Sequence, residues 1–450
     1  MISRRSRPAW PSSWPTASTA SARAGRPSGE RQPAMTDLGG LPFAPAPEAL
    51  GFDAEGLRLL DAWTADMVHS GHVAGASTLL MRHGQVAAFN THGALRLGAP
   101  EPLSRDALFR IYSMTKPVTG VAMMILFEEG RWTLDDPITK FLPEFVDLKV
   151  YNGLNAAGEM VVADAERAPT MRELMSHTAG FGYGLFDLHP VEWAYRDHAV
   201  LSAESGDDLV ARAARIPLMF QPGTEWFYSI ATDLQAVIVE RLTGQRFGDV
   251  LQSRILDPLR MVDTGFQTRP DNEHRLTAIY SDDGQGGLRE ATHVFDMPIH
   301  DYTRPPRIQG GGGGLLSTAA DYARFCQMIL NGGELDGARI LRPETVALMG
   351  VNVVPDAVLA TSNPLRLLPF NPAFGFGLDF AVVLDPQALG AREGRGTLSW
   401  GGGGGTWFWI DPQNDLIFIG LIQRMADPVS AEFRGRARTL VYQALTHPEK

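Results

Sequence analysis

Strand-forming segments lie near both ends of this 450-residue chain and enclose a long middle region in which helical patterns dominate. Near the N-terminus, two apolar runs within 76–89 flank a His83-Gly84 turn, the pattern of a β-hairpin. A second hairpin is predicted over 406–422, with its turn at 411–414. Sheet-forming pieces that are far apart in a chain can bury their apolar faces together. We therefore expect both hairpins to share one antiparallel sheet, with the helical region inserted between them.

Helices are predicted where apolar residues recur at helical spacing behind an N-cap residue or before a glycine. The predicted helices follow an Asp53 N-cap, cover 118–129, open at a capping box at 170–173, and cover 231–242, 318–330 and 431–445. The helix over 118–129 is expected to be amphipathic, with Gly130 as its stop. Strands and helices together predict an α+β fold.

The same pattern predicts a tail and two intermixed domains. Residues 1–40 form the predicted disordered basic tail, 41–110 and 311–450 the α/β sheet domain, and 111–310 the mainly helical domain. A chain of this length can bury a core large enough for that arrangement.

The charge of the chain is unevenly distributed. Residues 1–34 contain six arginines and one acidic residue, a net charge of +5, so the remainder carries −16 of the total of −11. So acidic a body is a poor partner for nucleic acid or for anionic membranes. No apolar run reaches the roughly 18 residues of a transmembrane helix, and no signal peptide is recognised. We expect a cytoplasmic protein translated from Met1 or Met35, whose oligomeric state the sequence does not determine. The single cysteine, Cys326, allows no internal disulfide.

The motif with catalytic potential is Ser113-Met-Thr-Lys116-Pro117. A proline lacks a backbone N–H and is tolerated without a kink only in the first helical positions, so the helix should begin close to Ser113. Ser113 and Lys116 then lie on one face of the helix, within reach of each other. The Ser113 N–H is left free at the positive end of the helix dipole.

A serine at such a helix start can act as a nucleophile if a base lies beside it. A lysine is such a base when burial or nearby positive charge leaves part of it neutral near pH 7. A free N–H at a helix start is also the kind of donor that an oxyanion requires. S-x-x-K alone is a common chance match, so an N-capping Ser113 and a solvated Lys116 are the competing interpretation.

Three elements in the same order resemble those of family VIII carboxylesterases, relatives of class C β-lactamases and serine D-Ala-D-Ala peptidases. Ser-Met-Thr-Lys at 113–116 resembles their S-x-x-K element, and Tyr-Ser-Ile at 228–230 is similar to their Y-x-x element. Trp-Gly-Gly at 400–402 resembles the W-G-G that these esterases carry where lactamases have K-T-G. Residues 174–180 are similar to a further family segment, and the resemblance covers roughly 45–445.

The resemblance implies a β-lactamase/penicillin-binding-protein-like fold: an antiparallel sheet flanked by helices plus a helical domain, with the active site in the cleft between. The implied catalytic residues are Ser113, Lys116 and Tyr228, the implied oxyanion donors are the N–H groups of Ser113 and Gly403, and the implied substrate-binding residues are Trp400, Gly401 and Gly402. A Lys–Tyr pair can pass the serine proton to a leaving group, because a cation stabilises a phenolate.

Each of these positions also has a plainer interpretation. Tyr228 taken alone is an ordinary half-buried aromatic, Trp400 a packing residue, and 401–405 a flexible hairpin loop. His177, next to a Thr-Ala-Gly turn, is expected to be structural. Three long loops are expected to shape the pocket: 183–200, 285–310 and 352–395.

The predicted function is hydrolysis of small-molecule carboxylic esters with short acyl groups through an acyl-enzyme on Ser113. Ile230 in place of asparagine and Trp400 in place of lysine favour neutral esters over substrates with an amide side chain and a carboxylate. A β-lactamase or D-Ala-D-Ala peptidase, an acyltransferase with the same triad, and a catalytically silent binding protein are the alternatives. No metal or cofactor is expected, because H-E-x-x-H and a phosphate loop ending in G-K-[ST] are absent.

Overall fold

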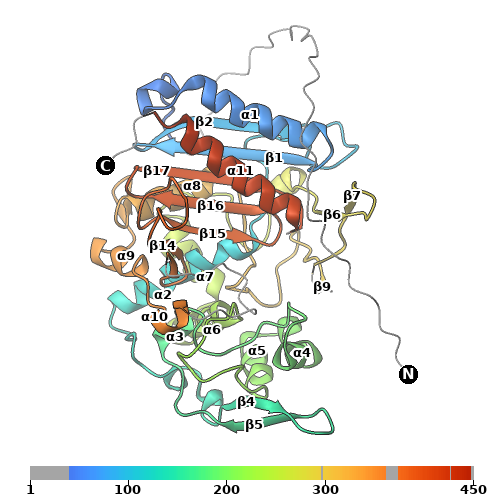
Figure 1. Cartoon of the computed structure of the whole chain (residues 1–450), viewed down its shortest axis with the longest axis vertical. Helices are drawn as coiled ribbons and strands as arrows, with labels where there is room; N and C mark the ends of the chain where they lie inside the picture. The colour runs from blue at the N-terminus through green and yellow to red at the C-terminus, as the bar shows by residue number, and fades with distance from the viewer. Residues whose placement is uncertain (1–39, 295–296, 361–372, 426, 447–450) are drawn as a thin grey trace. The chain divides into compact units, whose positions relative to one another are not determined.

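A seven-stranded antiparallel sheet, built from both ends of the chain, forms the core of the part of the chain that the structure describes (Figure 1). This computed structural model describes residues 40–294, 297–360, 373–425 and 427–446. In spatial order the strands are β13 (Phe374–Phe376), β14 (Ala381–Val383), β15 (Leu398–Gly402), β16 (Thr406–Asp411), β17 (Leu416–Ile422), β1 (Gly75–Arg82) and β2 (Gln85–Gly93). The predicted antiparallel sheet and its helical flanks are confirmed.

The N-terminal and C-terminal hairpins join where β1 pairs with β17, in a register that sets Ala76 opposite Ile422. Both predicted hairpins are present. His83 and Gly84 have φ values of 50° and 70°, the double positive φ of a two-residue turn that matches the twist of its strands. Of the predicted tail over 1–40, all but Gly40 lies outside the described residues.

Helices cover both faces of the sheet. One face lies under α1 (Ala54–His69) and α11 (Pro428–Ala444), which pack on each other, and the opposite face carries α8 (Ala319–Leu330) (Figure 1). The Asp53 side chain caps α1 by accepting from the Gly56 N–H at 2.9 Å, as predicted. None of the helices in the described ranges combines the length and apolar character needed to cross a membrane.

The predicted start of the last helix was wrong. We expected it over 431–445, but α11 begins at Pro428. The Asp427 side chain accepts from the Ser430 N–H at 2.8 Å, and Pro428 fits the first helical position because no N–H is needed there. The signal for the helix start is thus Asp427-Pro428, and the helix begins three residues before the apolar repeat at 431–445.

The region between the two sheet-forming parts is mainly helical. Its helices are α2 (Thr115–Glu128), α3 (Met171–Met175), α4 (Pro190–Asp197), α5 (Gly206–Ala213), α6 (Ala231–Thr243) and α7 (Phe247–Leu251), and α9 (Pro343–Met349) and α10 (Asp356–Ala360) come later. The capping box is formed, because the Thr170 side chain accepts from the Glu173 N–H and the Glu173 side chain accepts from the Thr170 N–H. The sequence did not predict the hairpin of β4 (Lys149–Leu154) and β5 (Met160–Asp164) within this region.

The helix that follows Ser113 is not amphipathic, and this prediction was wrong. Every residue of α2 from Thr115 to Leu126 is buried, including Lys116. Neighbours enclose it on several sides: α6 packs along it, Thr119 donates to the Gly311 carbonyl at 2.8 Å, and Asp379 approaches Gly120. A helix enclosed in this way has no solvent face, so its polar residues must find partners inside the protein.

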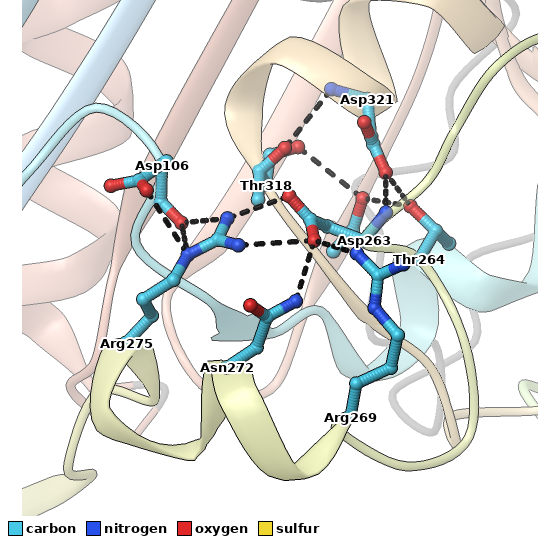
Figure 2. A network of polar contacts seen from close by, with 9 residues as sticks. Asp106, Asp263, Thr264, Arg269, Asn272, Arg275, Thr318 and Asp321 are labelled. Atoms are coloured by element: carbon cyan, nitrogen blue, oxygen red, sulfur yellow. Dashed lines mark hydrogen bonds and ion pairs between the residues drawn. The ribbon is translucent and has the colours of Figure 1, made fainter.

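A network of charged side chains fixes the N-terminal end of α8 (Figure 2). Asp263 accepts from the Arg275 guanidinium at 2.6 Å, and Arg275 also donates to the Asp106 carbonyl. Asp321 in the first turn of α8 accepts from the Asp263 N–H at 2.8 Å and from Thr264 at 2.9 Å. Burial raises the pKa of Asp321 to about 6, and these hydrogen bonds oppose the rise.

Helix α8 also fixes the short segment that precedes α2. The Tyr322 hydroxyl of α8 donates to the Met114 carbonyl at 2.8 Å. Beside it, β10 (Leu316–Ser317) pairs with β3 (Phe109–Arg110), the strand that leads into this turn. Ser113, between Arg110 and Met114, is therefore fixed from two neighbouring elements.

Candidate active site

The structure brings Ser113 and Tyr228 into direct contact. The Tyr228 hydroxyl donates a hydrogen bond to Ser113 Oγ at 2.5 Å. Ser113 lies in the short 3-10 helix Tyr112–Met114, which runs directly into α2, and Tyr228 lies just before α6. The predicted helix start next to Ser113 is therefore present, with Pro117 in the first turn of α2.

Lys116 is fully buried beneath the tyrosine, which rules out the solvated-lysine interpretation. Its Nζ donates to the Gly312 carbonyl at 2.7 Å and to the Tyr183 hydroxyl at 3.0 Å. Nζ also lies 4.5 Å from the centre of the Tyr228 ring. Within the described residues, no hydrogen bond joins Nζ to Ser113 Oγ, and Tyr228 lies in contact with both side chains.

Two of these partners were not predicted from the sequence. Tyr183 belongs to no motif, although its ring packs edge-on against Tyr228 with centroids 5.3 Å apart. Gly312 contributes only a backbone carbonyl, within the glycine run 310–314. A Cβ at Gly312 would lie 2.7 Å from the Tyr183 hydroxyl, so the absence of a side chain allows the Lys116 contacts to form.

Buried carboxyl groups lie behind the lysine. Asp233 Oδ1 accepts from the Gly312 N–H at 2.9 Å and so holds the peptide whose carbonyl contacts Lys116. Burial raises the pKa of Asp233, against the opposing effect of the Lys116 charge. Burial likewise raises the pKa of Asp379 to about 8, so this carboxyl is mostly protonated at neutral pH. The electrostatic surroundings of the site therefore depend on groups in three distant segments.

His177 packs against Tyr228 and holds the residue that follows it. Its Nδ1 accepts from the Ser229 N–H at 3.3 Å, and its ring lies 5.1 Å from the Tyr228 ring. Burial, together with the nearby Lys116 charge, holds the pKa of His177 well below its usual value, so the ring is neutral. These contacts agree with the structural role that we expected.

The glycine run after Trp400 allows a close backbone approach, so the flexible-loop interpretation does not apply to it. A Cβ at Gly402 would lie 2.3 Å from the Ile111 carbonyl, and one at Gly404 would lie 2.6 Å from the Tyr112 ring. Without those side chains, the turn between β15 and β16 rests directly on the segment that leads into Ser113. Gly403 then lines the same cavity as Ser113.

A cavity of about 820 Å³ opens over Ser113, and the six candidate residues that line it are Ser113, Tyr228, Trp400, Gly401, Gly402 and Gly403. The Trp400 ring packs on Tyr228 and Phe376, with centroids 5.5 and 5.2 Å away. Of the three loops expected to shape the pocket, 183–200 and 352–395 contribute lining residues, and the described part of 285–310 contributes none. Residues 361–372 of the last loop lie outside the described residues.

Comparison with known proteins identifies relatives over nearly the whole of this chain. The Beta-lactamase family model matches residues 60–443. Protein Rv1367c of Mycobacterium tuberculosis is 38% identical over 80% of this chain and 88% of its own length. Esterase EstB of Burkholderia gladioli is 29% identical over 88% of this chain and 98% of its own length. The solved structure of EstCE1, described as a hydrolase with promiscuous acyltransferase activity, superimposes with a TM-score of 0.71 and 25% identity, covering 88% of this chain and 99% of that one.

Proposed function

This chain belongs to the beta-lactamase family and is a hydrolase of the carboxylesterase type, and we propose that it cleaves esters of short acyl groups through an acyl-enzyme on Ser113. The observation that supports this most is the 2.5 Å contact between the Tyr228 hydroxyl and Ser113 Oγ, with Lys116 Nζ 4.5 Å from the same tyrosine ring. A nucleophile, a proton acceptor and a charge that favours proton transfer thus lie in one chain of contacts.

The reaction has two stages. In the reactive form Tyr228 is a phenolate, whose negative charge the Lys116 cation stabilises. The phenolate oxygen takes the proton of Ser113 as Oγ bonds to the ester carbonyl carbon. The N–H groups of Ser113 and Gly403 bind the oxyanion. The bond to the alcohol breaks, and Tyr228 returns the proton to the leaving alkoxide. Water then attacks the acyl-enzyme, gives a proton to Tyr228, and releases the acid as Ser113 regains its proton.

A panel of 4-nitrophenyl acyl esters, a penicillin and a chromogenic cephalosporin tests the proposal on the wild-type protein and on Ser113→Ala. We expect kcat/KM for short esters to exceed that for both lactams by a wide margin, because Ile230 and Trp400 replace the groups that would engage lactam substituents. Ser113→Ala should reduce ester hydrolysis to background. Equal or faster lactam turnover would show that the esterase proposal is wrong.

Acyl transfer to an alcohol is a second candidate, favoured by the acyltransferase activity in the description of EstCE1. The acyl-enzyme is common to both reactions, and the acceptor alone differs. Adding a primary alcohol to the ester assay should divert acyl groups into a new ester, and the ratio of acid to ester product measures this. A product composed only of acid at high alcohol concentration would leave hydrolysis as the sole reaction.

A further inference from the structure

The cavity over Ser113 extends past the edge of β15 to the opposite face of the sheet. Its lining there includes Arg434 and Arg438 of α11, together with Glu393 and Tyr442. Only Leu398 and Ser399 of β15 pair with β14, so the following residues of the strand border the cavity without a neighbouring strand on that side. One continuous space therefore connects the nucleophile with a charged wall on α11.

Gly401 forms the boundary between the two parts of this space. A Cβ at Gly401 would lie 3.2 Å from Arg434 Nη2 and 3.3 Å from Arg434 Cζ. The guanidinium therefore lies against the backbone of the predicted substrate-binding strand. A side chain at this position would have to displace it.

The Arg434 side chain has no polar partner in the described part of the chain. No hydrogen bond or ion pair joins its guanidinium to any residue in the described ranges, and its Nε is buried without an acceptor. The neighbouring Arg438 differs, because it forms an ion pair with Glu393 at 2.8 Å and lies over the Trp409 ring. Tyr442 donates to Asp411 at 2.7 Å. Glu393 and Asp411 are therefore already engaged, and among the described residues the charge of Arg434 remains uncompensated.

Arg434 is half-buried, with its Nε enclosed, so its charge is only partly hydrated, and a ligand that supplies an anion would offset the cost of that partial burial. Its fixed fork of donors matches the two oxygens of a carboxylate. A single uncompensated charge suits a singly charged group better than a phosphate dianion. The aromatic lining contributed by Trp407, Phe408 and Tyr442 suits a hydrocarbon chain.

We propose that Arg434 binds a free carboxylate on the substrate, so that the preferred esters are half-esters of dicarboxylic acids whose second carboxylate reaches α11. This inference rests on the proposed function and narrows its substrate class. It also reverses the preference for neutral esters expected from Trp400. Arg434 on α11 supplies the positive charge that the W-G-G motif lacks.

The test compares two 4-nitrophenyl esters of adipic acid, one with the second carboxyl free and one with it capped as a methyl ester. The proteins are wild type, Arg434→Met, Arg434→Lys and, as the matched control, Arg436→Met, which removes an exposed arginine of the same helix outside the cavity. Ser113→Ala provides the background, and thermal melts show that each variant is folded.

We expect wild-type kcat/KM to be at least about tenfold higher for the free acid, the size of one charge-assisted hydrogen bond. Arg434→Met should remove that ratio, Arg434→Lys should reduce it partly, and Arg436→Met should preserve it. A wild-type ratio near or below one overturns the inference even if Arg434→Met does not fold, as does an unchanged ratio in a folded Arg434→Met. If the free-acid ester and the capped ester are both cleaved with the same kcat/KM, only this inference fails and the proposed function stands. If neither ester is cleaved above background, the proposed function fails with it.

Discussion

The raised pKa of Asp379, a buried carboxyl near Lys116, can be tested through the pH dependence of the free energy of unfolding. Its carboxyl is fully buried, Oδ1 accepts from Gln235 Nε2 at 3.2 Å and from Thr232 Oγ1 at 3.3 Å, and Oδ2 has no partner in the described part of the chain. Burial raises its pKa from 3.8 to about 8. Asp379→Asn preserves the shape and the accepting oxygen, and asparagine tolerates the backbone φ of 61° at this position.

The sign of the effect follows from proton binding. Between about pH 4 and pH 8 the folded protein holds the Asp379 proton and the unfolded chain does not, so the wild-type free energy of unfolding falls as the pH rises. Each pH unit in that window costs about 1.4 kcal/mol. Asparagine has no proton to lose. The advantage of Asp379→Asn over wild type should therefore grow by about 2.7 kcal/mol between pH 5 and pH 7, and level off above the pKa of about 8.

Urea unfolding of both proteins at pH 5, 6, 7 and 8 measures this difference. The control is Asp271→Asn, which makes the same substitution at an exposed aspartate outside the site. A difference between wild type and Asp379→Asn that stays constant from pH 5 to pH 8 would refute the reasoning, because the folded protein would then not retain that proton.

Three further predictions concern the site itself. Lys116→Ala should lower kcat/KM for a short aryl ester by at least about 10²- to 10⁴-fold with the fold intact. Lys116→Arg should fail nearly as badly, because the larger planar guanidinium does not fit the fully buried position of Nζ between the Gly312 carbonyl and the Tyr183 hydroxyl, and activity within tenfold of wild type would contradict this. Tyr183→Phe removes one acceptor from Lys116 Nζ and should lower kcat about tenfold with little change in KM; an unchanged kcat would leave the Gly312 carbonyl as the acceptor that matters. Gly402→Ala should lower both the melting temperature and kcat, because its Cβ would lie 2.3 Å from the Ile111 carbonyl, and wild-type values in both measurements would contradict this.

The sequence was sufficient for features whose signals are local. Pro117 indicated where α2 begins, and the turn at His83-Gly84 indicated the first hairpin. The start of α11 was equally local, at Asp427-Pro428, but we gave more weight to the apolar repeat behind it. Local signals are physically simple, because capping and turn formation involve residues within four positions of each other.

The remainder of the site depends on contacts between distant segments. Tyr183 meets Lys116 across 67 positions, and the carbonyl of Gly312 meets it across 196. A backbone carbonyl leaves no trace in the residue types, and a tyrosine without a motif resembles any core aromatic. The same limit explains the error over α2, because its apolar residues indicated one buried face and its remaining faces are covered by segments far away in sequence.

The pairing of β1 with β17 also determines when this protein can fold during its synthesis. Strand β1 leaves the ribosome early, but its partner follows only about 340 residues later. The Thr446 N–H donates to the Gly51 carbonyl and the Asp53 N–H to the Ala444 carbonyl, so the early α1 region also waits for the last described residues of the chain. At the usual ~5–20 residues per second, the first hairpin is exposed without its neighbour for roughly 17 to 70 seconds. During that interval the edge of β1 that later pairs with β17 is available to chaperones or to aggregation. In the folded protein β17 covers it.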